Sequence, residues 1–150
     1  MSRIAQLAPT AARLLLGLIF FVFGLNGFLH FLPMPPPEGV AGTFMGGLAA
    51  TGYFFPLLKG TEVLAGLLLL GNRFVPLALI VLAPIVVQIA AFHLFLAPAS
   101  LAMAGFLVVA EAYLAWTHRV AFQGVLAATP AAARGERRAP SLAGAAVAQR

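Results

Sequence analysis

The second apolar stretch of the chain reads YFFPLLKGTEVLAGLLLL from residue 53 to residue 70, long enough to cross a bilayer as a helix. Two charged residues, Lys59 and Glu62, interrupt it. A charged side chain inside a bilayer costs about 2.5–3.5 kcal/mol even on a permissive insertion scale, so such residues usually mark a functional site. Two more ionisable residues, His93 and Glu111, lie in other apolar stretches. The sequence therefore indicates a membrane protein with a polar interior.

The composition agrees with this class and argues against others. Of the 150 residues, 62% are hydrophobic and 9% are charged, which is too little polar surface for a soluble domain. The net charge is +5, but the basic residues lie at the ends of apolar stretches and near the C-terminus, so we expect no nucleic-acid binding. Because the chain has no cysteine, it has no disulfide or iron–sulfur cluster of its own.

Four continuous apolar segments predict the fold class, an all-α integral membrane protein with a four-transmembrane-helix bundle. The segments cover residues 12–32, 53–70, 74–96 and 100–118. They belong to a membrane domain over residues 12–127, between an N-terminal segment over 1–11 and a disordered basic tail over 128–150. The first segment is longer than the apolar core of a signal peptide and no small-residue cleavage site follows it, so we interpret it as a span.

The connections contain residues that end helices. Four prolines between residues 33 and 37 predict the end of the first helix, because proline supplies no backbone donor. Residues 38–52 are rich in glycine and are compatible with an interfacial or re-entrant helix and equally with an irregular loop. Residues 71–73 predict a tight turn, and Pro84 predicts a kink in the third span.

The distribution of basic residues predicts the orientation. With the N-terminus in the cytoplasm, Arg3, Arg13, Arg73, Arg119 and the arginines of the tail all face inward, and Lys59 alone faces outward. This arrangement satisfies the positive-inside rule, and the inverted one violates it throughout. We therefore expect both termini on the cytoplasmic side.

Polar side chains gather toward the outer ends of the four predicted spans. At 1.5 Å per residue, Lys59 lies about 9 Å and Glu62 about 13 Å from the outer end of its helix, and Glu111 lies about 16 Å deep. In a bundle we expect all such side chains to face inward. They are Asn26, His30, Lys59, Glu62, Gln88, His93 and Glu111.

Their spacing suggests roles. Lys59 and Glu62 are three residues apart and can pair, which leaves Glu111 to share a proton or to accept a hydrogen bond from Asn26, Gln88 or His93. We predict Glu62 and Glu111 as proton acceptors in catalysis. Asn26, Lys59, Gln88 and His93 are the predicted ligand-binding residues. Structural alternatives remain open, because Lys59 can extend to the headgroups, and the amides can simply hold helices together.

Two metal-containing alternatives use the same residues. His30 and His93 lie at similar depth on different helices and could ligate a b-type haem from both sides. His93, Glu62 and Glu111 could form a closed metal site, but no ligand-spacing motif supports it. We therefore predict no metal.

Several motifs resemble the DoxX family of small four-span bacterial membrane proteins. They are RLLLG at residues 13–17, FGLN at 23–26, KGTE at 59–62 followed by Gly66, GNRFVPLAL at 71–79, LAP at 82–84 and Phe92-His93. The fourth span is similar in hydropathy only, so the prediction for Glu111 rests on its depth in the membrane. The resemblance implies a four-helix bundle in a bacterial inner membrane. It also implies relatives linked to thiosulfate:quinone oxidoreduction or to oxidative-stress complexes.

These observations lead to three functional hypotheses. The first is a quinone-linked redox membrane subunit or accessory, with the quinone non-covalently bound and electrons supplied by a protein partner. In it, Lys59 and His93 bond the quinone carbonyls. The second is a non-catalytic scaffold of an oxidative-stress or respiratory complex, with the basic tail binding partners or anionic lipid. The third and weakest is a small transporter, because four helices leave little room for alternating access unless the chain forms a homo-oligomer.

Overall fold

The structure is a computed structural model that describes residues 3–123. Residues 1–118 form one compact unit, and a second unit begins at Arg119. The second unit is described only as far as Gln123 and contains one short helix, α6 (Arg119–Phe122). The tail predicted over residues 128–150 lies outside the described residues.

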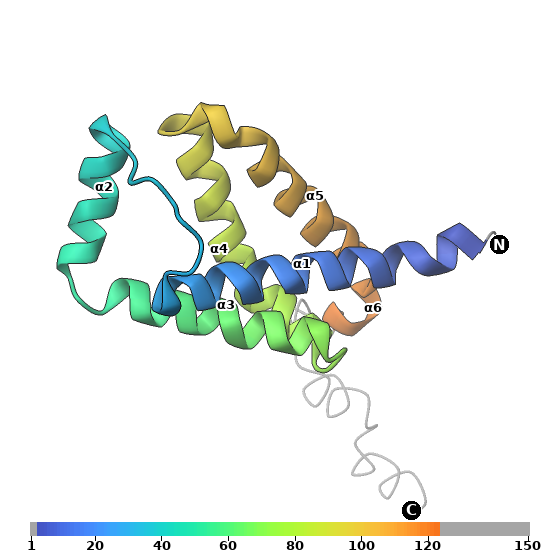
Figure 1. Ribbon diagram of the computed structural model, residues 1–150. Helices are drawn as coiled ribbons and strands as arrows, with labels where there is room; N and C mark the ends of the chain where they lie inside the picture. The colour runs from blue at the N-terminus through green and yellow to red at the C-terminus, as the bar shows by residue number, and fades with distance from the viewer. Residues whose placement is uncertain (1–2, 124–150) are drawn as a thin grey trace, which may run out of the picture. The chain divides into compact units, whose positions relative to one another are not determined.

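All the regular secondary structure of the described chain is helical, which confirms the all-α prediction. The long helices of the first unit are drawn in Figure 1. They are α1 (Arg3–Leu29), α2 (Gly39–Ala50), α3 (Phe54–Leu70), α4 (Val75–Phe95) and α5 (Leu101–Thr117), with a short 3₁₀ helix, η1 (Pro98–Ser100), before α5. Residues 38–52, which were compatible with a helix or an irregular loop, therefore contain a helix.

Three stretches of the described chain are long and apolar enough to cross a membrane, namely Leu7–Leu29, Val75–Phe95 and Pro98–Thr117. The number rises to four if α2 and α3, which are bent by 91° at a short break, count together as one span. With 17 residues, α3 alone is about 25 Å long, somewhat less than the hydrocarbon core. Of the four predicted spans, three thus contain a single helix long and apolar enough to cross a membrane, and the fourth depends on α3.

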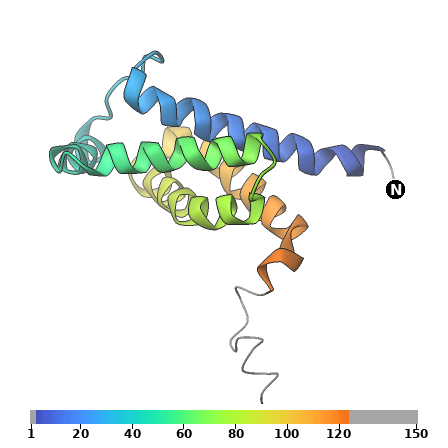
Figure 2. The same ribbon diagram turned by 90° about the horizontal axis from the view of Figure 1, so that it is seen from below.

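Helices α1, α3, α4 and α5 contact one another in a closed ring. α1 lies antiparallel to α3, and these two run side by side in both Figure 1 and Figure 2. α3 also contacts α4, α4 contacts α5, and α5 contacts α1. The largest fully buried side chains all come from this ring and are Leu16, Leu69, Leu82 and Leu114.

Glycines allow α1 and α3 to approach closely. A Cβ atom at Gly66 would lie 2.6 Å from the backbone nitrogen of Phe21 and 2.9 Å from the carbonyl oxygen of Gly17. A Cβ atom at Gly24 would lie 2.9 Å from the backbone nitrogen of Val63. Since backbone atoms cannot move aside as side chains do, these positions require glycine. Small residues of this kind typically hold helices together in membranes.

The predicted tight turn joins α3 to α4. The backbone N–H of Arg73 donates to the carbonyl of Leu68 at 2.9 Å, and Asn72 takes a left-handed conformation with φ of 52°, a common way to end a helix. The Arg13 guanidinium of α1 donates to the last carbonyls of α3, on Leu69 and Leu70. A cation at a helix C-terminus is favourable for both hydrogen bonding and the helix dipole. This contact ties the N-terminal half of α1 to the end of α3.

The ends of α1 differ from the prediction. The helix begins at Arg3 and passes through Pro9, although the predicted span starts at residue 12. It ends at Leu29, three residues before the predicted end at residue 32, and the next residue, His30, is left-handed with φ of 51°. α4 continues through Pro84 as one helix.

Candidate functional site

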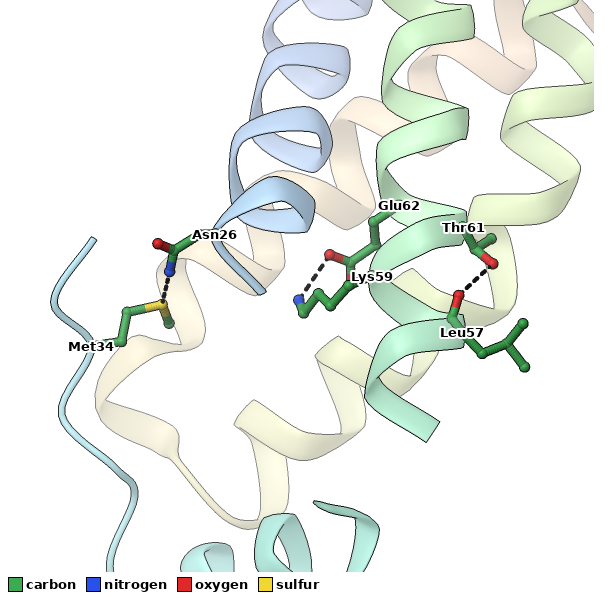
Figure 3. Close-up of polar contacts among 6 residues, drawn as sticks. All are labelled: Asn26, Met34, Leu57, Lys59, Thr61 and Glu62. Atoms are coloured by element: carbon green, nitrogen blue, oxygen red, sulfur yellow. Dashed lines mark hydrogen bonds and ion pairs between the residues drawn. The ribbon is translucent and has the colours of Figure 1, made fainter. Parts of the chain in front are cut away.

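An ion pair on α3 is the best-defined polar contact of the molecule's interior. Lys59 Nζ lies 2.8 Å from Glu62 Oε2, as Figure 3 shows. The Glu62 side chain is 4% exposed and that of Lys59 is 24% exposed. The two residues are three apart on one helix and therefore share a face. The ammonium group contacts the carboxylate of Glu62, so the predicted pair is confirmed.

A glycine on α1, Gly27, leaves room for the side chain of Lys59. A Cβ atom at Gly27 would collide with the aliphatic carbons of Lys59, mainly Cγ and Cδ. A Cβ atom at Gly24 would lie 3.1 Å from Glu62 Cβ. Both members of the ion pair therefore lie directly against the glycines of α1, and this close packing fixes where the charges sit.

Asn26 is buried and holds the segment that follows α1. Its Oδ1 accepts a hydrogen bond from the backbone N–H of Leu32 at 2.6 Å, and its Nδ2 donates to the Leu32 carbonyl at 3.3 Å. Nδ2 also lies 3.5 Å from Met34 Sδ (Figure 3). The whole amide is therefore engaged with the chain just beyond the helix. These contacts give Asn26 a structural role, and its predicted role in ligand binding stays a prediction.

Glu111 differs from the other predicted site residues because one of its carboxyl oxygens is buried without a hydrogen-bond partner. It is 7% exposed, it lies in α5, and α5 contacts both α1 and α4. Its Oε1 is buried without a hydrogen-bond partner. Most buried polar atoms in proteins are hydrogen-bonded, so an unsatisfied carboxyl oxygen in the interior requires an explanation, such as a bound ligand.

His93 is half-buried near the end of α4. Its Nδ1 lies 2.8 Å from the carbonyl oxygen of Ile89, one turn earlier on the same helix. A carbonyl can only accept, so Nδ1 carries the proton, and in the neutral ring Nε2 is the nitrogen that can accept a hydrogen bond. The ring also makes an edge-on contact with Phe92, with centroids 5.4 Å apart. This contact and the hydrogen bond fix the orientation of the imidazole.

The expectation that all seven polar side chains face inward is wrong for two of them. Gln88 and His30 are exposed. His30 follows the end of α1, where the chain leaves the helix, and Gln88 lies on the outer side of α4. Helical periodicity explains the second error. The buried residues of α4, from Val75 to Val86, define the face that meets its neighbours, and Gln88 does not continue that face.

The remaining polar groups lie toward one end and in the middle of the ring without forming one cluster. Because consecutive helices run in opposite directions, the C-terminal ends of α1 and α4 and the N-terminal ends of α3 and α5 lie on the same side. Asn26, Lys59 and His93 belong to those halves of their helices, Glu62 is the middle residue of α3, and Glu111 lies just beyond the middle of α5, in its C-terminal half. Among the described residues, no hydrogen bond or ion pair joins Glu111 or His93 to the pair on α3. Two polar sites on separate helices are therefore present, one with a charged pair and one with an unsatisfied carboxyl group.

The part of the chain that the structure describes contains no group of three or more His, Asp or Glu side chains placed to hold a metal ion. The closed metal site of His93, Glu62 and Glu111 is thus not formed. The exposed His30 and the fixed orientation of His93 give no support to a haem held between them.

We did not predict from the sequence that Arg13 binds the end of α3. The charge pattern explains it as an orientation signal, and the structure adds its hydrogen bonds to the end of α3. One feature of the sequence pointed to this role. The last turn of α3 has no basic residue of its own, and Arg13 lies in the preceding span.

Comparisons of the chain with models of protein families, with curated proteins and with solved structures find no match.

Proposed function

We propose that this chain is a small multi-pass membrane protein that binds the headgroup of a quinone among the polar groups of its helix ring, as a redox membrane subunit or accessory. In this proposal, Lys59 donates a hydrogen bond to one oxygen of the headgroup. Glu62 and Glu111 accept protons from the reduced form, and Nε2 of His93 serves as a further hydrogen-bond partner.

The unsatisfied Oε1 of Glu111 is the observation that carries the proposal. A buried carboxyl oxygen without a partner destabilises the fold unless something binds it, and function is the usual reason for keeping such a group. Asparagine or glutamine would hold the helices together at a lower cost. The chain thus retains a proton-accepting group where packing alone would favour an apolar side chain.

The donor set fits a quinone headgroup. A quinone carries two oxygen atoms at opposite edges of an apolar ring, and the structure offers polar groups on separate helices, α3 and α5, within largely apolar surroundings. When bound, the quinone supplies the capacity to accept and release electrons together with protons. The chain's own residues bind, orient and exchange protons with it.

The electrons must come from another protein. The chain has no cysteine for an iron–sulfur cluster or dithiol, and its described residues form no metal site. The resemblance to the DoxX family supports a bacterial inner-membrane location and a redox partner of this kind. Lipid quinone would reach the headgroup site from the bilayer.

The orientation follows from the arginines. We propose that both termini face the cytoplasm, since Arg13 and Arg73 lie at the same end of the helices and Lys59 lies toward the other. In intact cells, a membrane-impermeant thiol reagent should label Tyr53→Cys and not Gln123→Cys, both at exposed positions. The reverse pattern would mean that the molecule is inverted.

Quinone titration of the purified protein tests the function. The wild type should bind saturably, and Glu111→Gln or Glu62→Gln should weaken binding of the reduced form, the quinol, about tenfold or more, because a carboxylate accepts a strong hydrogen bond from a quinol hydroxyl. Glu38→Gln is the matched control, because Glu38 is exposed and lies outside the helix ring. It should bind as the wild type does. Absence of saturable binding to the wild type would remove the proposal.

A scaffold function is the second candidate, and the contacts that three of the polar residues already make favour it. Lys59 and Glu62 satisfy each other, and Asn26 bonds to the backbone, so these groups already have structural partners. A scaffold predicts that Glu62→Gln changes stability and leaves partner binding intact. It also predicts that a chain lacking residues 128–150 no longer captures its partners. Normal capture by that truncated chain would exclude docking through the tail.

A further inference from the structure

Gln88 is a polar side chain on the lipid-facing side of a membrane-spanning helix. It is exposed, and it forms no hydrogen bond with another described residue. Counted from the end of α4 at Phe95, it lies about 10 Å along the helix axis. Lipid tails offer neither donors nor acceptors, so an amide at this depth remains unsatisfied unless another protein helix supplies them.

The exposed residues around Gln88 form a regular seam. Leu77, Val81, Pro84, Gln88 and Phe95 are all exposed, and Ala91, which is half-buried, completes the row. The steps between successive members alternate between four and three residues. Such steps keep these side chains on one face of the helix, as along the contact line of two parallel, left-handed supercoiled helices. We name these six residues the α4 seam.

We propose that the α4 seam is the interface with a second copy of this chain, and that the Gln88 amides of the two copies bond to each other. All copies inserted in one membrane share one orientation, so two α4 helices related by an axis normal to the bilayer run parallel. The same residue of each copy then meets at the axis. An amide side chain contains both a donor and an acceptor, so it is complementary to itself.

The amide also explains why the pairing has one register. A single polar residue in an otherwise apolar helix contact fixes the alignment of the helices, because any shift separates the polar groups and buries each against hydrocarbon. The seam contains one polar residue, Gln88, between apolar residues on both sides. A surface that served only to contact lipid would have no use for this residue. The inference does not depend on quinone binding.

Disulfide cross-linking tests the interface. Because the chain has no native cysteine, only the introduced thiol can form a disulfide. Val81→Cys places a thiol in the seam, one heptad before Gln88. Val87→Cys is the matched control, because Val87 is 67% exposed on the same helix and lies outside the seam. In membranes, the first variant should form disulfide-linked dimers of the chain, and the second should form few. Equal cross-linking of the two, no cross-linking of Val81→Cys, or a product containing a different protein would overturn the proposal.

The role of the Gln88 amide is tested in the Val81→Cys variant. Adding Gln88→Leu to Val81→Cys should reduce the dimer fraction at limiting protein density, corresponding to association about tenfold weaker. Gln88→Asn keeps a self-complementary amide and should restore much of the loss. Circular dichroism of each variant establishes that the helices are intact. If Gln88→Leu cross-links as strongly as its parent, the amide pair does not form, and the proposal is wrong.

Discussion

Replacing Lys59 by methionine should lower the free energy of unfolding by about 3 kcal/mol, because it leaves the Glu62 carboxylate buried without its partner. The ammonium contributes the 2.8 Å contact to Glu62, and methionine keeps the apolar part of the side chain that packs against Gly27. The loss should therefore report on the charge rather than on packing. Reversible unfolding in detergent micelles with increasing denaturant measures it.

The double variant Lys59→Met/Glu62→Leu provides the control. Removing both charges of a buried pair and filling the space with apolar side chains is often neutral or stabilising, so this variant should recover most of the stability lost in Lys59→Met. Should Lys59→Met unfold at the same denaturant concentration as the wild type, Glu62 has no need of its partner. The ion pair would then contribute nothing to the fold.

Replacing Gly66 by alanine should destabilise the fold by about 1–3 kcal/mol, the usual cost of overpacking a well-filled interior. The added Cβ would lie 2.6 Å from the backbone nitrogen of Phe21, so the two helices would have to separate. Unfolding of the variant under the same conditions measures the effect.

Gly60→Ala is the matched control for Gly66→Ala. Gly60 lies in the same helix, and a Cβ atom there would meet nothing within 4 Å. Alanine also favours the helical conformation by up to about 1 kcal/mol relative to glycine, so Gly60→Ala should be neutral or stabilising. Equal losses from both variants would mean that helix conformation, and not the close approach of α1 and α3, determines the requirement for glycine.

Much of the fold follows from hydropathy and from helix-ending residues. The boundaries of α3, α4 and α5 agree with the predicted spans to within a residue or two, because a turn at Gly71 and a proline at Pro98 end the apolar runs there. The start of α1 was predicted too late, since the prediction followed the apolar run and the helix extends beyond it to Arg3. Proline is accepted in the first turns of a helix, and hydropathy does not register the helical turns outside the apolar core.

The candidate site was only partly predictable. The pairing of Lys59 with Glu62 follows from their spacing on one helix, and the burial of Glu111 agrees with its depth. Depth alone does not determine the direction in which a side chain points, which is why Gln88 was expected inside and lies outside. The use of Asn26 to bond Leu32 could not be predicted, because it depends on how the chain turns after α1.

The resemblance to the DoxX family stays a prediction based on its motifs. Two of those motifs have a clear structural purpose here. Gly66 permits the approach of α1, and Asn72 adopts the left-handed conformation that ends α3. Motifs with such purposes report the packing of helices rather than the chemistry of a site.

Infrared difference spectroscopy of quinone binding tests the central claim, that the buried carboxyl groups serve a ligand, most directly. When the reduced headgroup binds, the carboxyl stretching band of Glu111 should shift, because its unsatisfied Oε1 accepts a hydrogen bond from a quinol hydroxyl. The shifted band should be missing from Glu111→Gln and present in Glu38→Gln. A wild-type spectrum in which bound quinol leaves every carboxyl band unchanged would contradict the account.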